Sequence, residues 1–168
     1  MITYRSPHRP VALILLLVCC ASCSGKESKA RNLLIQARTM LVPGRTVELV
    51  EHLEMIVEDY PETEAAVFAR QMLTEAIASG NKQAEMKLRE AWATSNIYFL
   101  EDPYGTLDME KLVVKGFKRD QEVILTVVNG ASYELEITSR HVVGDRIYSV
   151  DLEGNVTSEA NVNPPGPD

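Results

Sequence analysis

The hydrophobic residues of this chain change their spacing part of the way along it, and this change limits the folds that the chain can form. Between about residues 27 and 99 they recur every three or four positions, which is the period of an amphipathic helix. From residue 123 they form a continuous run and then alternate, as the residues of β-strands do. Helices followed by strands predict an α+β fold, in which helices cover an antiparallel sheet.

Residues that break or cap helices divide the helical part into four expected helices. Pro43-Gly44 ends the first, because proline lacks an amide hydrogen and glycine lets the backbone turn. Tyr60-Pro61 separates the second helix from the third. Ser79-Gly80-Asn81 indicates the end of the third helix and the cap of a fourth, over about residues 82–99.

Four strands are expected after residue 120. Val123–Val128 is continuously apolar and β-branched, which predicts a central strand that is covered on both faces. Asn129-Gly130 is a strong signal for a tight hairpin turn. The other strands are expected at Tyr133–Thr138, Arg146–Asp151 and Val156–Ser158. The predicted architecture is therefore N-terminal helical hairpins followed by a long helix packed on a four-stranded antiparallel sheet.

The N-terminus has the layout of a secretory signal peptide. Arg5 and Arg9 precede an uninterrupted apolar run, and the small residues Ala21 and Ser22 follow it. The apolar run is about half as long as the roughly 20 residues that span a bilayer, so a membrane-spanning anchor is the weaker alternative. Residues 1–22 are therefore predicted to be a signal peptide.

The residues around the predicted cleavage site resemble a bacterial lipobox. Residues 20–23 are Cys-Ala-Ser-Cys, although Cys20 stands where leucine is usual. The resemblance implies that Cys23 carries fatty acids such as palmitate, and that residues 23–30 are a flexible tether. Ser24 is compatible with an anchor in the outer membrane, on its periplasmic face, rather than in the inner membrane.

The cysteine content agrees with an acylated Cys23. Cleavage before this residue leaves it as the single cysteine of the mature chain, so no internal disulfide can form. The alternative is an ordinary secreted or periplasmic protein that is cleaved near Ala21 or Ser22 and keeps a spare thiol.

Two further resemblances concern the rest of the chain. The stretch Leu53–Ala66, with Tyr60-Pro61 inside it, resembles the junction between two tetratricopeptide helices, and it assigns residues 31–80 to a helical region. Only about one such unit is present, whereas a solenoid needs about three, so a plain helical hairpin is the alternative.

The second resemblance is to the globular head of type IV pilins and pseudopilins, and it covers residues 82–158. It rests on Tyr98, Tyr104-Gly105-Thr106-Leu107, Gly116-Phe117, His141, Gly144, Tyr148-Ser149-Val150-Asp151 and Gly154-Asn155-Val156. It implies an α+β domain over residues 82–158. Separately, Pro164, Pro165 and Pro167 predict that residues 159–168 are a disordered tail. Pilins begin with a long hydrophobic helix that polymerises. Because the predicted leader and Cys23 take its place here, packing into a pilus core is not expected.

Composition and motifs argue against several classes of function. All 24 acidic residues lie beyond the predicted leader, whereas two of the 17 basic ones lie within it. An acidic chain without a basic cluster does not favour nucleic acid as a partner. The sequence has no phosphate-binding loop, dinucleotide fingerprint or nucleophile motif. Beyond the leader, His52, His141 and one cysteine cannot supply four zinc ligands. No catalytic residue, metal, cofactor or small-molecule substrate is therefore expected, and the protein is not predicted to be an enzyme.

These observations predict a lipid-anchored cell-envelope protein that serves as a structural or protein-interaction module, in the setting of a type IV pilus or secretion assembly. The alternative is a tetratricopeptide-like scaffold that binds other envelope proteins through its helices. Tyrosine and arginine concentrate binding energy at interfaces. The candidate partner contacts are therefore Tyr104, in the predicted loop Glu101–Thr106, and Arg140, His141 and Arg146, in the predicted loop Arg140–Arg146.

Overall fold

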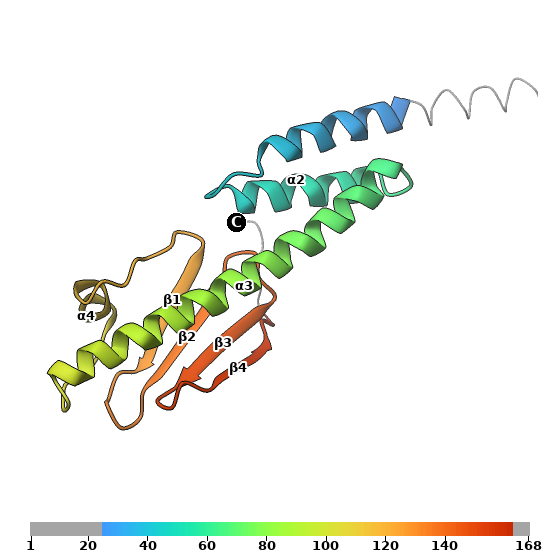
Figure 1. Ribbon diagram of the computed structural model, residues 1–168. Helices are drawn as coiled ribbons and strands as arrows, with labels where there is room; N and C mark the ends of the chain where they lie inside the picture. Colours follow the sequence, from blue (N-terminus) through green and yellow to red (C-terminus); the bar gives the residue numbers. More distant parts are fainter. Residues whose placement is uncertain (1–24, 163–168) are drawn as a thin grey trace, which may run out of the picture.

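One long helix, α3, runs through almost the whole molecule, and α2, α4 and the sheet pack against it (Figure 1). The computed structural model describes residues 25–162. In order, its elements are a first helix over residues 25–39, α2 (Thr46–Asp59), α3 (Glu64–Glu101), α4 (Met109–Val114), β1 (Val123–Asn129), β2 (Glu136–His141), β3 (Arg146–Asp151) and β4 (Val156–Ala160). The strands form one antiparallel sheet in the order β1-β2-β3-β4. The prediction of an α+β fold, with a long helix on a four-stranded antiparallel sheet, is confirmed.

Several predicted segments fall wholly or partly outside the described residues. The signal peptide, residues 1–22, and Cys23 lie outside them. From residue 25 onward the predicted tether, residues 23–30, is part of the first helix. The first two residues of the predicted tail, 159 and 160, belong to β4 instead, because they pair with β3. Over residues 25–162, none of the helices is both long and apolar enough to cross a membrane.

The predicted helix break at Ser79-Gly80-Asn81 is wrong, because α3 continues through it for a total of 38 residues. A glycine that ends a helix takes a positive φ, and Gly80 does not. Its small size is needed for packing: a Cβ at this position would lie 2.6 Å from Nδ1 of His141, at the end of β2. The glycine therefore marks a close approach between helix and sheet, and α3 extends for about 57 Å.

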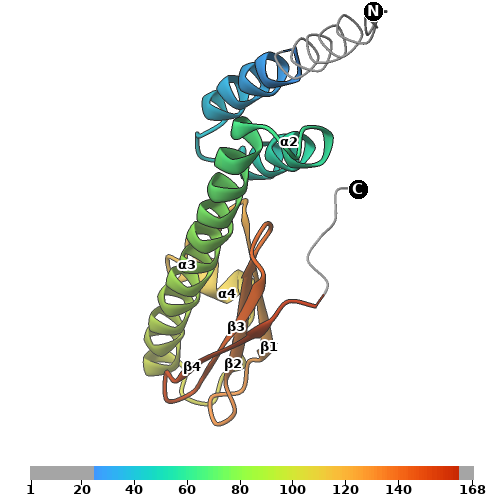
Figure 2. The ribbon, with the colours of Figure 1, turned by 90° about the vertical axis from the view of Figure 1, so that its right-hand side faces the viewer.

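Buried side chains form two separate cores along α3. Figure 2 shows the helical part and the sheet beside different stretches of this helix. The first core lies between the first helix, α2 and the start of α3, where Ala65, Ala66 and Ala69 let the helices approach closely. The second lies between the later turns of α3, α4 and one face of the sheet, and it includes Leu88 and Ile137. Between the cores is a narrow region that we call the waist, which consists of residues 79–83 of α3 together with Glu122 and His141.

The prediction that Val123–Val128 is a central strand is wrong, because β1 forms an edge of the sheet. Its side chains alternate, with Val123 buried and its neighbour Ile124 exposed on the face away from α3. The second strand also begins later than Tyr133, which is 76% exposed in the preceding loop. The continuous apolar run reflects β-branched residues on an exposed face and not a second covering layer.

The Asn129-Gly130 pair does not form a two-residue turn. Gly130 lacks the positive φ of that turn, and β2 resumes only at Glu136. The amide of Leu107 donates to the carbonyl oxygen of Gly130 at 2.7 Å, and a Cβ on Gly130 would lie 1.9 Å from the Leu107 carbonyl oxygen. This glycine therefore lets the loop before α4 pair with the end of β1.

We predict that Gly80→Ala destabilises the protein, although alanine in a helix interior normally stabilises by about 1 kcal/mol over glycine. The added methyl group overlaps the His141 ring, and overpacking of this kind costs about 1–3 kcal/mol. Denaturant unfolding should measure the difference.

The matched controls for this prediction are Ser79→Ala and a double variant. Ser79 is exposed on the same turn of α3, so Ser79→Ala should change the free energy of unfolding by only a few tenths of a kcal/mol, in the stabilising direction. In a His141→Ala background the overlap is gone, and Gly80→Ala should become stabilising. If Gly80→Ala stabilised the otherwise unchanged chain, the close approach would be refuted.

Candidate functional site

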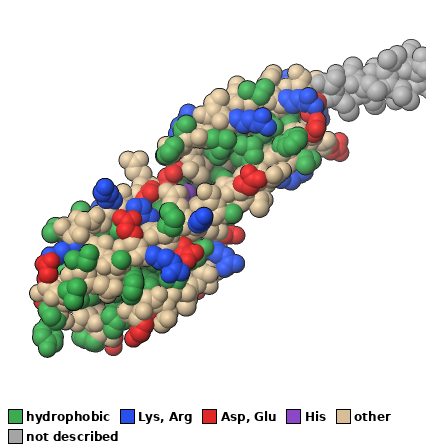
Figure 3. All heavy atoms as spheres, in the orientation of Figure 1, with side chains coloured by type: hydrophobic (Ala, Val, Ile, Leu, Met, Phe, Trp, Pro, Cys, Tyr) green, Lys and Arg blue, Asp and Glu red, His purple; other side chains and the backbone are tan. Residues whose placement is uncertain are grey.

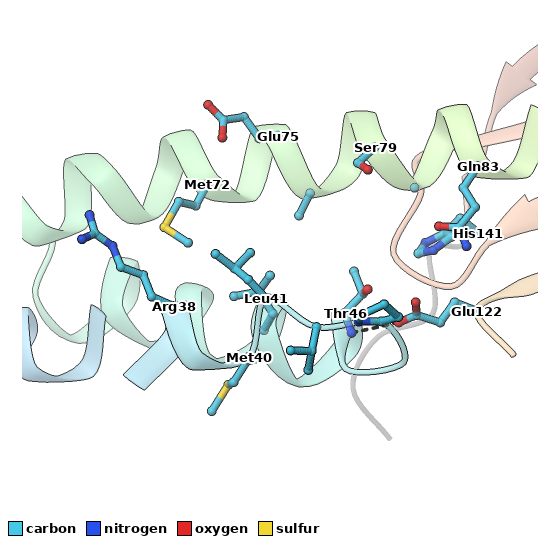
Figure 4. A pocket seen from close by; sticks show the side chains of 15 residues that line it. Arg38, Met40, Leu41, Thr46, Met72, Glu75, Ser79, Gln83, Glu122 and His141 are labelled. Carbon is cyan, nitrogen blue, oxygen red and sulfur yellow. Dashed lines mark hydrogen bonds between the residues drawn. The ribbon is translucent and has the colours of Figure 1, made fainter. Parts of the chain in front are cut away.

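A cleft of about 750 Å³ opens at the waist, between the helical end of the molecule and the sheet (Figure 4). One wall is a single face of α3, on which Met72, Ala76, residues 79–80 and Gln83 follow one another every three or four positions. The small side chains in the middle of this face leave the space that forms the cleft. Ligand-binding cavities of proteins have this size and are lined, like this one, mainly by apolar groups with a few polar ones.

The opposite wall is the connection between the first helix and α2. Met40, Leu41, Val42 and Pro43 line it, and Leu41 is 60% exposed although it faces the cleft. Leu49 of α2 lies between the walls. Loops that connect helices are usually polar, so four successive apolar residues here are the sequence signal for the cleft, and the sequence prediction missed it.

Glu122 closes the sheet end of the cleft and joins the two halves of the molecule. Its carboxylate accepts hydrogen bonds from the amides of Thr46 at 2.8 Å and Gly44 at 3.3 Å (Figure 4). The N-cap residue of α2, Arg45, makes no side-chain cap of its own. An acidic group from just before β1 therefore caps α2 and complements its dipole across 76 residues of sequence.

His141 lies beside Glu122 at the same end of the cleft. It is 1% exposed, and its Nδ1 accepts a hydrogen bond from the amide of Val143 at 3.3 Å. A ring that accepts at Nδ1 carries its proton at Nε2. Among the described residues, this buried Nε2 has no hydrogen-bond partner. Burial lowers the pKa of His141, and the carboxylates of Glu122 and Asp120 only partly oppose this effect.

Polar contacts hold α3 to the loops at both sides of the waist. Gln83 donates to Asp120 at 2.8 Å, and Asn81 donates to Asp145 at 2.6 Å. Burial acts to raise the pKa of Asp120, but hydrogen bonds from the Glu122 amide and from Gln83, and the nearby charge of Lys87, lower it overall. Among the described residues, two buried polar atoms of the waist have no hydrogen-bond partner: the donor Nε2 of His141 and the acceptor Oδ1 of Asn81.

The structure does not bring the candidate partner contacts together. Arg140 and His141 are neighbours in β2, so their side chains point to opposite faces of the sheet, His141 toward α3 and Arg140 away from it. Arg146 is exposed at the start of β3 and donates to Ser158 at 3.1 Å. Tyr104 is 97% exposed near the far end of α3, which is about 32 Å of helix away from the waist.

Tyr104 is instead one of several exposed apolar residues near the end of α3 and in α4. We call this group the distal apolar surface; it consists of Ile97, Leu100, Tyr104, Val113 and Val114. Leu100 is 83% and Val114 80% exposed, and an ion pair between Lys115 and Glu101 holds α4 against α3 beside them. Figure 3 shows hydrophobic side chains gathered at this end of the molecule.

Comparisons with known proteins give no family. The chain matches no model of a known protein family and no curated protein sequence. Over residues 25–162, no three histidine, cysteine or acidic side chains are grouped so that they could hold a metal ion.

We predict that acidification destabilises the protein partly through His141. Its pKa in the folded chain lies below the ordinary value of 6.5, so between these two values the unfolded chain binds the extra proton. The free energy of unfolding should therefore fall as the pH drops through 6.5. In His141→Gln, denaturant unfolding between about pH 7.5 and pH 5 should show a smaller loss. An unchanged loss would mean that His141 titrates normally.

Proposed function

We propose that this protein is a lipid-anchored cell-envelope protein that acts as a structural or protein-interaction module. The lipid is attached to Cys23, and the anchor is in the outer membrane, on its periplasmic face. The sequence Ala21-Ser22-Cys23 after an apolar run supports the lipid, and Ser24 supports the choice of membrane. The alternatives are an anchor in the inner membrane and a secreted or periplasmic protein without a lipid.

The main support for this proposal is that the first helix and the distal apolar surface lie at opposite ends of the molecule. Residue 25, the first described residue, is already helical and lies two positions after Cys23 in the sequence. The first helix lies at the end of the molecule opposite to the end of α3 that carries the distal apolar surface (Figures 1 and 2). The α3 helix, about 57 Å long, separates these ends. An anchor at Cys23 would hold the helical end at the membrane and point the distal apolar surface away from it.

The distal apolar surface has the composition of an interaction site. Apolar residues as exposed as Leu100 and Val114 are costly in water when they occur in a group, and such groups mark contact surfaces. Tyr104 adds an aromatic side chain of the kind that dominates binding energy. The partner is another envelope protein. The resemblance of residues 82–158 to pilin heads supports a setting at a type IV pilus or secretion assembly.

The anchor is tested by Cys23→Ser. This variant should move from the membrane fraction to the soluble fraction and should no longer incorporate a clickable fatty acid, because the acyl chains supply the membrane affinity. Alkaline carbonate washing of the membranes distinguishes an anchor from a peripheral contact. Full membrane retention of the variant would contradict lipidation.

The interaction surface is tested by photocrosslinking in native membranes. A photoreactive residue at position 100 or 114 should capture a partner, and one at position 51 or 54, on α2, should not. Adding Leu100→Asp to the position-114 probe should abolish capture without changing the melting temperature, because this side chain is mostly exposed. Capture that survives Leu100→Asp would contradict the proposal.

One observation favours the alternative, a helical scaffold. A second hollow, of about 320 Å³, lies between the first helix and the start of α3, where Arg31, Ile35 and Phe68 line it. Ile35 and Phe68 are both exposed, so this hollow offers apolar side chains next to a charge. Capture from position 35 or 68, and none from 100 or 114, would make the helices the binding part.

A further inference from the structure

We propose that the cleft at the waist binds the acyl chain of a single-chain lipid with an uncharged, carbonyl-bearing head group. The chain lies along α3, and the carbonyl oxygen accepts a hydrogen bond from Nε2 of His141. This site goes beyond the proposed function, which requires no small ligand, and beyond the sequence-based expectation of no small-molecule substrate.

The first argument is the unpaired donor of His141. Its Nδ1 is occupied by the Val143 amide, which leaves the hydrogen on Nε2, and this atom is buried without a partner among the described residues. A buried N–H group without an acceptor is rare in folded proteins because it loses its hydrogen bond to water. His141 is one of the residues that line the sheet end of the cleft, so a ligand that brings an acceptor to this end would supply the missing partner.

The second argument is the charge around that donor. The carboxylates of Glu122 and Asp120 lie near His141 and act on it electrostatically. An anionic group placed here would be repelled by both, whereas a neutral carbonyl oxygen accepts the hydrogen bond without that repulsion. The acceptor is therefore an ester or amide carbonyl rather than a carboxylate or phosphate.

The third argument is the apolar length of the cleft. From Gln83 at the sheet end to Met72 at the other, the lining face of α3 is about 16 Å long (Figure 4). This is close to the length of an extended chain of about a dozen carbon–carbon bonds. Leu41, Leu49 and Ala76 face this space in its middle, and their side chains have no polar atoms.

The apolar lining of the cleft favours an acyl chain over a peptide as its ligand. A peptide carries an amide every residue, and each amide that leaves water needs a hydrogen-bond partner. The middle of the cleft presents apolar side chains, whereas an acyl chain has no polar group to satisfy there. Arg38 lies at the outer end and offers a competing site for an anionic head group. Arg38 is exposed, so solvent screens its charge.

The test is calorimetric titration of the unacylated full-length chain, Cys23→Ser, with 1-monolauroylglycerol, whose head is neutral. The binding should be one to one, and dodecanoate, with the same chain length but an anionic head, should bind at least tenfold more weakly. Equal or tighter binding of dodecanoate would overturn the neutral head group, and absence of binding by 1-monolauroylglycerol would overturn the site.

Matched variants locate the binding. Ala76→Trp places an indole group across the middle of the cleft and should abolish binding, whereas Ala78→Trp, on the exposed side of the same helix, should leave it unchanged. If Ala76→Trp fails to fold, Leu41→Asp replaces it, because Leu41 is exposed in a connection and tolerates a polar residue in the fold. Binding that persists in the cleft variant that folds would overturn the proposal.

His141→Phe tests the hydrogen bond. The ring keeps its shape and loses its donor, so binding of 1-monolauroylglycerol should weaken about tenfold, which is the value of one hydrogen bond. Unchanged affinity would overturn the role of Nε2. Capture of another protein by a photoreactive residue at position 41, together with no lipid binding, would overturn the acyl-chain ligand and assign the cleft to a protein partner.

Discussion

The whole arrangement depends on α3 remaining helical where its own sequence favours an end. Ser79, Gly80 and Asn81 are poor helix formers, and Gly80 alone costs about 1 kcal/mol relative to alanine. The cores at either side offset this cost, because each buries a different stretch of the same helix. A break at the waist would detach the two cores from each other, so tertiary packing overrides local propensity here.

Contacts between distant residues then fix how the two halves meet. Glu122 caps α2 from a position 76 residues away in the sequence, and Asn81 reaches Asp145 across 64 residues. Ser139 donates to the carbonyl oxygen of Ala84 at 2.8 Å and so joins β2 to the turn of α3 just beyond the waist. Each contact is modest by itself, but together they link α2, α3 and the sheet at one level of the molecule.

The parts of the fold that could be predicted are those set by local periodicity. The faces of α2 and α3 follow from hydrophobic spacing, and the third strand, Arg146–Asp151, was predicted with its observed limits. The errors occur where a residue has more than one physical use. Gly80 and Gly130 have the appearance of caps and turns, but both are small because another backbone or ring approaches them.

The candidate site could be predicted less well than the fold, because its residues come from four separate stretches of sequence. The exposure of Tyr104 could be predicted because this residue lies in a loop. The burial of His141 could not, because it depends on the close approach of its ring to Gly80. Glu122 gave no signal among 24 acidic residues. The apolar connection at residues 40–43 was the one local clue, and it was assigned only to the end of a helix.

The cleft and the distal apolar surface lie at different levels of the same rod, and this separation has a physical consequence. The walls of the cleft belong to both halves: Leu41 and Leu49 to the helical end, and Glu122 and His141 to the sheet. A ligand that contacts both walls binds only while they face each other, and it stabilises that arrangement by mass action. Because α3 continues unbroken from the waist to Leu100, any change in how the halves meet alters the direction in which the distal apolar surface points. An acyl ligand at the waist would therefore stabilise the orientation of that surface relative to the helical end of the molecule.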